Sequence, residues 1–407
     1  MINRGYKQQK GAALLIFITI VILGAATLLV NQLGNVGSSY RQSTTSMQAL
    51  TEAREALIGW SASHPSLPGL LPLPDLDNNG ESDCVVGIGS NILIGRLPFA
   101  TPAAPACGDA QNSLGVRATD ASGEPLWYAV SRNLLYDDGY PTSLDATNDW
   151  ITVRDSQGNI ISDRVVAVII APGLALSGQN RSTNPLAANR YLDAVTIGTV
   201  TYSNFDLDRE FIAAEQGDIF NDYLVYITID ELMLQAGRVM ARRIGSDVRA
   251  CLDGDAAAGD GTYSWTARLN GALSPDYNDD VGEKLGRLPD LPTSGGWTPA
   301  NCFALLSYWQ SWKEQLFYQV ASGYQPGSAA SCPTCLNLDG SGNKHAMLML
   351  AGPPLTGQQR TTNADKGDIS YYLEGDNGDG DNLFANQAQS ASFNDRVLCV
   401  DGGVTCN

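Results

Sequence analysis

Apolar residues form one unbroken run near the start of the chain. Residues 12–30 contain no charged side chain, and the residues before Gly11 carry the cations Arg4, Lys7 and Lys10 and no acid. In a helix that rises about 1.5 Å per residue, this run extends about 28 Å, close to the hydrocarbon thickness of about 30 Å. The pattern predicts a membrane-spanning helix, with the cations on the cytoplasmic side.

Two later segments have the three- and four-residue spacing of amphipathic helices. In the first, Ala49, Ala53 and Leu57 recur among polar residues, and in the second the apolar positions run from 232 to 248. Acids stand at 230 and 231 and arginines follow them, an order that complements the helix dipole. We therefore expect one N-terminal helical unit over 12–62 and a second helix after residue 229.

The segments that follow these helices occur in two similar copies. GRLP stands at 95–98 and at 286–289, EPLWYAV at 124–130 resembles EQLFYQV at 314–320, and FNDYLVYI at 220–227 resembles FNDRVLCV at 393–400. Because the matches keep one order along the chain, we infer an internal duplication, with globular domains over 63–228 and 229–407. Short segments rich in Val, Ile and Tyr predict strands, so each copy is interpreted as a helix on an antiparallel sheet, an α+β fold.

Charge and composition narrow the classes of function. The 407 residues include 43 acids against 25 Lys and Arg, for a formal charge of −18, so nucleic acid is not an expected partner. Only His64 and His345 are available as histidine bases or metal ligands, and the sequence contains neither a Gly-x-Ser-x-Gly motif nor a phosphate-binding loop. We expect no enzymatic activity, and a capping or surface role for His64.

The N-terminal pattern resembles that of type IV prepilins and type II secretion pseudopilins, in which a short basic leader ending in Gly is followed directly by a long apolar helix. The resemblance covers residues 1 to about 60. It implies a leader over 1–11, cleavage after Gly11 by a prepilin peptidase, and N-methylation of Ala12. The family usually has Glu as the fifth mature residue, whereas Ile16 stands here, a departure shared with certain large minor pilins and with the large pseudopilin at a filament tip.

By this resemblance the chain would be a non-catalytic minor pilin or pseudopilin subunit at or near a filament tip, with a pilin-like helix and two tandem pilin-like domains. The expected partners are other pilin or pseudopilin subunits, the prepilin peptidase and, before assembly, the inner membrane. The expected location is a single pass through that membrane with a periplasmic C-terminal part, then a periplasmic or cell-surface filament. Two alternatives stay open: a filament-borne adhesin or ligand-binding module, and a signal-anchored periplasmic protein of unknown activity.

Eight cysteines follow the apolar run, an even number in a predicted oxidising compartment, so disulfides are expected. The sequence leaves the connectivity open, and pairing between neighbours is the simplest arrangement. A redox motif is the alternative at 332–335, but no helix start is predicted there to activate a thiolate. The neighbouring pairs are Cys84–Cys107, Cys251–Cys302, Cys332–Cys335 and Cys399–Cys406.

The acidic loop 75–83 resembles the first nine positions of a calcium loop, with oxygen-bearing side chains at alternate residues and Gly80 at the sharp turn. Val86 stands where such a loop has its bidentate acid, so one more ligand would have to come from elsewhere. A solvated acidic turn is the alternative, and no other cofactor is expected. The expected calcium ligands are Asp75, Asp77, Asn79, Glu81 and Asp83, with a weaker echo at Asp376, Asp379 and Asp381.

Overall fold

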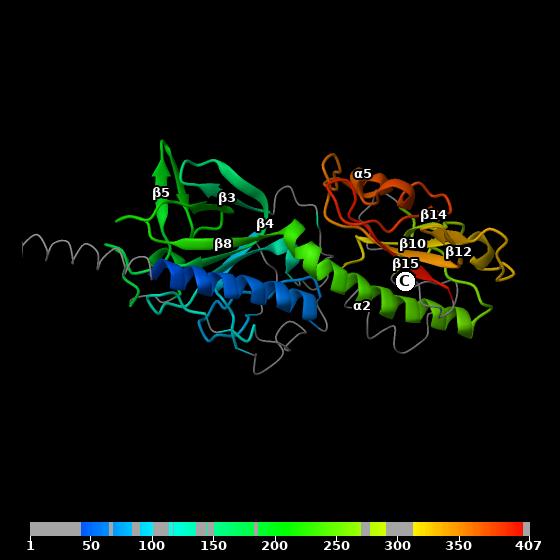
Figure 1. Cartoon of the computed structure of the whole chain (residues 1–407), viewed down its shortest axis with the longest axis horizontal. Helices are drawn as coiled ribbons and strands as arrows, with labels where there is room; N and C mark the ends of the chain where they lie inside the picture. Colours follow the sequence, from blue (N-terminus) through cyan, green and yellow to red (C-terminus); the bar gives the residue numbers. More distant parts are fainter. Residues whose placement is uncertain are drawn as a thin grey trace, which may run out of the picture.

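Two sheets, each covered by one long helix, lie side by side along the longest axis of the molecule (Figure 1). The computed structural model describes residues 42–64, 68–83, 90–100, 114–116, 118–135, 144, 150–182, 186–269, 277–289 and 312–401.

The first half combines a helix over residues 42–63 with a six-stranded sheet. Leu50, Ala53 and Leu57 are fully buried, whereas Glu52 and Glu55 are exposed, so the helix is amphipathic as its spacing predicts. The long strand β4 lies between β2 and β8 near its C-terminal end and pairs with β3 near its N-terminal end. The strands are β1 (Ile92–Arg96), β2 (Trp127–Ser131), β3 (Ile151–Asp155), β4 (Ile160–Ala171), β7 (Glu210–Ala213) and β8 (Tyr223–Thr228).

The second half combines α2 (Ile229–Ala258) with a four-stranded antiparallel sheet. Its strands are β9 (Leu285–Arg287), β10 (Leu316–Val320), β13 (Ala346–Leu350) and β15 (Arg396–Val400).

Smaller elements occur in both halves. The first half has the β5–β6 hairpin (Ala194–Ile197, Val200–Ser203) and the 3-10 turns η1 (Arg132–Leu134) and η2 (Ala188–Arg190). The second half has the sheet of β11 (Leu336–Leu338), β12 (Ser341–Lys344) and β14 (Leu383–Phe384), the short helix α5 (Asn363–Lys366), and the 3-10 turns η3 (Ser322–Tyr324), η4 (Ile369–Tyr371) and η5 (Gly375–Asn377).

Four strands follow the same order in both halves. β1-β2-β4-β8 in the first sheet corresponds to β9-β10-β13-β15 in the second, and every neighbouring pair among them is antiparallel. The registers also agree: Arg96 lies opposite Trp127, as Arg287 lies opposite Phe317. The strands β2 and β10, which carry the similar sequences WYAVS and LFYQV, are buried along their whole length.

The two halves share one continuous hydrophobic core. α2 begins at the residue after β8 and contacts β4 and β8 as well as β13 and β15. Trp312 is fully buried where the halves meet, and its indole N–H donates to the carbonyl of Pro68 at 3.0 Å. Gly69 has a φ of +86°, and a Cβ at this position would lie 2.5 Å from both Met240 Sδ and Trp312 Cζ2. This close approach requires glycine.

The predicted fold class is corrected in two respects. The six-stranded sheet and the small sheet of β11, β12 and β14 are mixed rather than antiparallel, because β3 pairs with β7 and β11 pairs with β14 in parallel. Alternating apolar residues fix which face of a strand is buried but carry no information on strand direction. The parallel pairs could therefore not be predicted from the pattern. The described part is therefore a mixed α/β fold that consists mostly of sheet.

The second correction concerns the membrane. Across the described ranges, none of the helices has both the length and the apolar character needed to cross a bilayer. The predictions of a membrane-spanning helix, of a single-pass inner-membrane location and of a pilin-like fold that begins with such a helix are corrected accordingly. The leader over 1–11, the run 12–30 and the residues Gly11, Ala12 and Ile16 lie outside the described residues.

Candidate functional site

A buried polar network connects the loop after β4 with the segments that precede β5 and β8. Gln179 Nε2 donates to Asp193 Oδ1 at 2.8 Å, and the main-chain N–H groups of Asn221 and Asp222 donate to Asp193 Oδ2 at 2.7 and 3.2 Å. In return, the Asp193 N–H donates to Asp222 Oδ2 at 2.8 Å. The two carboxyl groups thus hold each other's backbone segments in place.

Asn204 and Arg181 extend this network to two further segments of the same half. Asn204 Nδ2 donates to Asp222 Oδ2 at 3.0 Å, and its Oδ1 accepts from the Ile212 N–H at 2.9 Å. Arg181 Nη1 donates to the carbonyl of Gly173 at 2.9 Å. Arg181 Nη2 also donates to Gln179 Oε1 at 3.3 Å, so five polar side chains from distant parts of the first half form one hydrogen-bonded network.

The second half contains an equivalent network. Gln358 Nε2 donates to Glu374 Oε1 at 2.8 Å, and the N–H groups of Asn394 and Asp395 donate to Glu374 Oε2 at 2.9 and 3.2 Å. The Glu374 N–H donates to Asp395 Oδ2 at 2.7 Å, and Asn377 Nδ2 reaches the same oxygen at 3.1 Å.

The outer contacts of the second network also repeat. Asn377 Oδ1 accepts from the Ala385 N–H at 2.9 Å, as Asn204 does from Ile212. Arg360 Nη1 donates to the carbonyl of Gly352 at 2.9 Å, as Arg181 does to Gly173. The two halves therefore agree in buried hydrogen bonds as well as in strand order.

Each network brings two acids together away from water. Asp222 is 2% exposed and Asp395 is fully buried. Burial, followed by the charge of the partner acid, raises the pKa of both carboxyls well above the ordinary range of Asp. The Oδ1 atoms of both have no hydrogen-bond partner within the described residues, while every donor points to other oxygens. The burial of Asp222 and Asp395 favours a proton on one acid of each pair.

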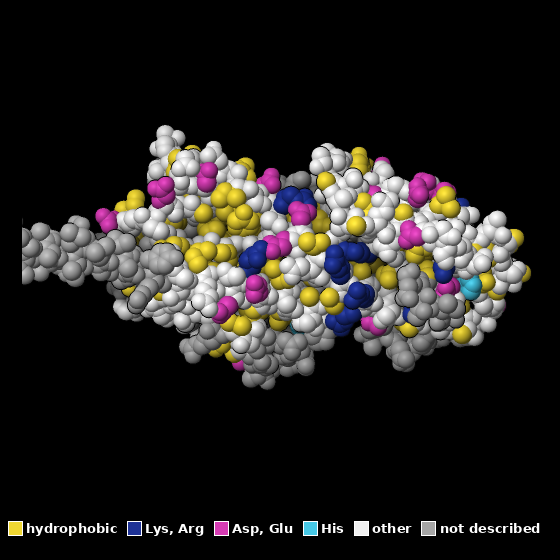
Figure 2. Space-filling view, in the orientation of Figure 1, with side chains coloured by type: hydrophobic (Ala, Val, Ile, Leu, Met, Phe, Trp, Pro, Cys, Tyr) yellow, Lys and Arg dark blue, Asp and Glu magenta, His cyan; other side chains and the backbone are white. Residues whose placement is uncertain are grey.

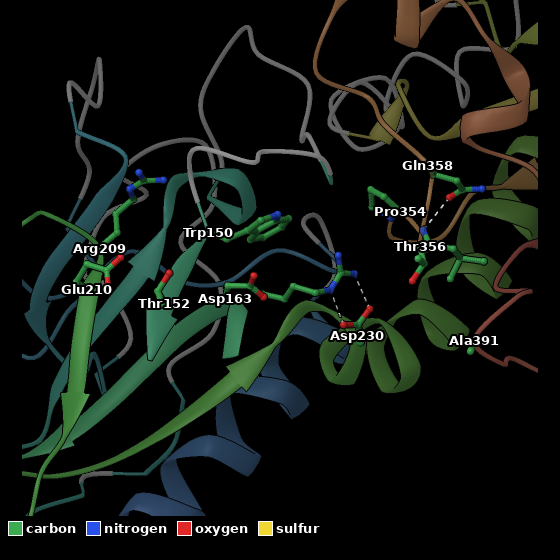
Figure 3. A pocket seen from close by; sticks show the side chains of 12 residues that line it. Trp150, Thr152, Asp163, Arg209, Glu210, Asp230, Pro354, Thr356, Gln358 and Ala391 are labelled. Carbon is green, nitrogen blue, oxygen red and sulfur yellow. Dashed lines mark hydrogen bonds and ion pairs between the residues drawn. The ribbon is translucent and has the colours of Figure 1, made fainter. Parts of the chain in front are cut away.

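An open cleft lies between the two halves (Figure 3). Its volume is about 670 Å³, and it is lined by strands of the first sheet, by the start of α2 and by the loops after β13 and before β15. Arg164 and Asp230 form a two-pronged ion pair in the cleft, with N–O distances of 2.8 and 2.7 Å, and Figure 3 shows Trp150 above this pair. The other lining residues are Thr152, Asp163, Arg209, Glu210, Pro354, Leu355, Thr356, Gln358 and Ala391.

The chemistry of the cleft suits a polar, uncharged ligand. Its cations and carboxylates occur together, and amide and hydroxyl groups stand beside an aromatic ring, the combination that fixes ligands in orientation. Gln358 lines the cleft and also donates to Glu374, so it connects the cleft to the second buried network. A smaller cavity of about 420 Å³, which Gln358 also lines, reaches Glu374 directly.

Three members of the predicted calcium loop lie close together. Asp75, Asp77 and Asp83 place oxygen atoms within 4.8 Å of one another. Asp75 accepts from the N–H groups of residues 78, 79 and 80, and Asp83 accepts from those of 76 and 77. Gly80, with a φ of +90°, makes the predicted sharp turn. Asn79 Oδ1 accepts from the N–H of Glu81, and Glu81 does not belong to the acidic group. Calcium binding stays a prediction.

The weaker acidic echo does not form such a group in the part of the chain that the structure describes. Asp379 accepts from the N–H of Asp381, and Asp381 accepts from the N–H of Leu383. Asp376 lies in the single turn η5. These carboxylates hold successive turns of their own loop.

Of the predicted disulfides, the structure contains the one between Cys332 and Cys335. Cys251 and Cys399 are also disulfide-bonded. The expected partners of these two, Cys302 and Cys406, lie outside the described residues, as do Cys84 and Cys107.

Sequence reasoning missed the two networks and misplaced one histidine. His64 is 1% exposed, with its ring 4.3 Å from that of Trp60, and burial, followed by the charge of Arg243, lowers its pKa to about 4. For the networks a signal existed: the aligned copies share GQNRST with GQQRTT and FND with FND, which places Gln, Arg, Asn and Asp at matching positions. Identical polar residues in otherwise divergent copies indicate shared buried hydrogen bonds.

Comparisons with family models, with curated proteins and with solved structures each found no match to this chain.

Proposed function

We propose that this chain is a non-catalytic subunit of a protein filament, located at or near one end. The observation that carries the proposal is the half-buried helix over residues 42–63. One face packs into the first core, while Gln48, Glu52 and Glu55 on the other face are exposed. An amphipathic helix with one open polar face can pack on its own domain and on a neighbouring subunit at once.

The sequence before this helix supports the same proposal. A basic leader that ends at Gly11, followed by an apolar run, resembles the start of filament subunits that are cleaved and methylated at that junction. Ile16 supplies no carboxylate to pair with the terminal ammonium of an adjacent subunit, and a buried unpaired charge costs several kcal/mol. Repeated stacking is therefore unfavourable, and the second globular half adds bulk. Both arguments favour a few copies at one end.

A second candidate is a ligand-binding module carried on such a filament. The cleft of about 670 Å³ between the halves favours it, because binding sites for small ligands commonly lie between two structural units. This candidate differs from the first in what the chain contributes: recognition of a ligand rather than assembly of the filament.

One set of strains tests both candidates. Filaments sheared from cells that produce the chain should contain it in a few copies, with a methylated N-terminus at Ala12. Deletion of the gene should abolish or sharply reduce filament number. Filaments of normal number and length that no longer attach to surfaces would instead favour the ligand-binding module.

Glycine substitutions provide the matched control. Gly11→Leu should block processing and remove the chain from the filament fraction, while Gly5→Leu, a change of the same kind six residues earlier, should leave both unchanged. A chain that still begins at Met1 in the filaments, or dense labelling along the whole shaft, would contradict the proposal.

A further inference from the structure

Three arginines gather where α2 crosses the edge strand β15. Arg238 and Arg242 are exposed on α2, one helical turn apart, and Arg396 begins β15 beside them. Figure 2 shows Lys and Arg side chains concentrated over the middle of α2. We call Arg238, Arg242 and Arg396 the arginine patch.

Within the described residues, no carboxylate pairs with the arginine patch. By contrast, both acids in the first turn of α2 have an arginine partner: Arg164 pairs with Asp230, and Arg54 pairs with Glu231. Nε and Nη2 of Arg396 are buried and have no hydrogen-bond partner among the residues that the structure describes. Burial, followed by repulsion from Arg238 and Arg242, lowers the pKa of Arg396. The patch is therefore electrostatically unfavourable by itself.

The fold of the second half does not require these cations. The last turn of α2 contains no basic residue, so the arginines at 238 and 242 stand too far from the helix end to complement the dipole. At the position of Arg396 the first half has Tyr223: each pairs with the last residue of the equivalent strand, Leu350 or Ala171. The first half thus shows that an uncharged residue is compatible with this register.

Charge complementarity identifies the kind of partner. Guanidinium groups recognise carboxylates and phosphates, and two arginines one helical turn apart match two anionic groups with about 5 to 6 Å between them. The chain as a whole carries a charge of −18, so a long polyanion that extends beyond the patch would meet a repulsive surface. A short anionic segment avoids that repulsion.

We propose that the arginine patch is a docking surface for an acidic helix of a protein partner, with carboxylates at positions i and i+4. The inference is independent of the filament proposal, because it rests only on α2 and β15. The patch would then be a site at which an acidic partner can bind to a chain whose net charge is negative.

The test is a binding titration with the purified full-length chain. The probe is a fluorescein-labelled, alanine-based helical peptide with Glu at i and i+4, measured by fluorescence anisotropy. We expect saturable binding that weakens several-fold between 50 and 200 mM salt, as screening of charges requires. The same peptide with Gln in place of Glu should bind at least 10-fold more weakly.

Two variants with equal changes in charge locate the site. Replacing both Arg238→Ala and Arg242→Ala should weaken binding at least 10-fold, while Arg238→Lys with Arg242→Lys should retain most of it. Arg268→Glu also lowers the net charge by two, but Arg268 pairs with Asp280 and Glu283 at 2.9 and 3.2 Å, far from the patch in sequence, and this variant should bind like the wild type. Equal losses in the double alanine variant and in Arg268→Glu would overturn the proposal. Tighter binding of a 20-nucleotide oligothymidine than of the peptide would overturn it as well.

Discussion

The two halves of the molecule are alike inside and different outside. Gln179 and Gln358 occupy the same place in their networks, and so do Asp193 and Glu374, although the latter differ by one methylene. The periphery diverges: the first half adds β3, β7 and the β5–β6 hairpin, and the second adds β11, β12 and β14. Buried donors and acceptors must all find partners, so they constrain substitution much more strongly than exposed positions do.

Charge pairs at the edge of each network show which substitutions the two halves tolerate. In the first half Arg181 pairs with Glu124 at 3.2 Å, and its side chain is 11% exposed. In the second half Arg360 is fully buried and makes its hydrogen bonds to main-chain carbonyls and Gln358, while the acid equivalent to Glu124, Glu314, pairs with Lys366 at 3.1 Å. Each acid keeps a cation, but from a different segment. The requirement is thus for a neutralised acid rather than for a particular residue pair.

The largest effect is expected where the two halves meet. Trp312→Ala should lower the free energy of unfolding by about 3 to 5 kcal/mol, because it removes a fully buried indole and its hydrogen bond to Pro68. Since both halves share one core, the variant and the wild type should each unfold in a single transition, measured by circular dichroism in urea. Trp312→Phe should lose less, because the ring volume is largely kept. Two separate transitions in the wild type would show that the halves are independent.

A smaller effect is expected in the pH dependence of the unfolding free energy, which allows the two networks to be compared. Folding raises the pKa of Asp222 and Asp395 above the unfolded value of 3.8, so their stabilising contribution is complete at low pH and is lost as the pH rises through the folded pKa. Asp222→Asn and Asp395→Asn should each reduce this loss, and by similar amounts, because an amide mimics the protonated acid and keeps one oxygen for the same donors.

The measurement is the difference in unfolding free energy between variant and wild type from about pH 4 to about pH 8. His64 acts in the opposite direction, since its lowered pKa of about 4 makes stability rise with pH up to about 6.5, but it cancels in the difference. Unequal effects of the two variants would mean that the halves differ in protonation despite equal geometry.

The smallest effect concerns the acidic loop over 75–83 in the first half. If calcium binds Asp75, Asp77 and Asp83, a chelator should lower the melting temperature by about 1 to 2 °C, the shift expected for about 1 kcal/mol when the entropy of unfolding is about 2 cal/mol/K per residue. Asp77→Ala should remove this sensitivity while leaving Asp75 to hold the turn. A melting temperature that does not change when the chelator is added would identify the loop as a hydrogen-bonded turn without metal.

Parts of this architecture could be predicted from residue patterns, and parts could not. The spacing of Ala49, Ala53 and Leu57 indicated the first helix, and short segments rich in Val, Ile and Tyr indicated strands, among them β4 and β8. The parallel pairing of β3 with β7 was not predictable, because periodicity is the same for both directions. The cleft joins Trp150 to Gln358 across about half of the chain, and only the packing of α2 on both sheets brings these residues together.

The approach of Gly69 to Met240 and Trp312 has an evolutionary consequence. A larger residue at 69 cannot be accommodated unless a side chain from the other half becomes smaller, since a Cβ there would already lie 2.5 Å from both partners. Neither half is therefore free to drift, to be exchanged or to be deleted by itself. Once such a contact had formed, the two units had to change together, and what had been two heritable modules became one.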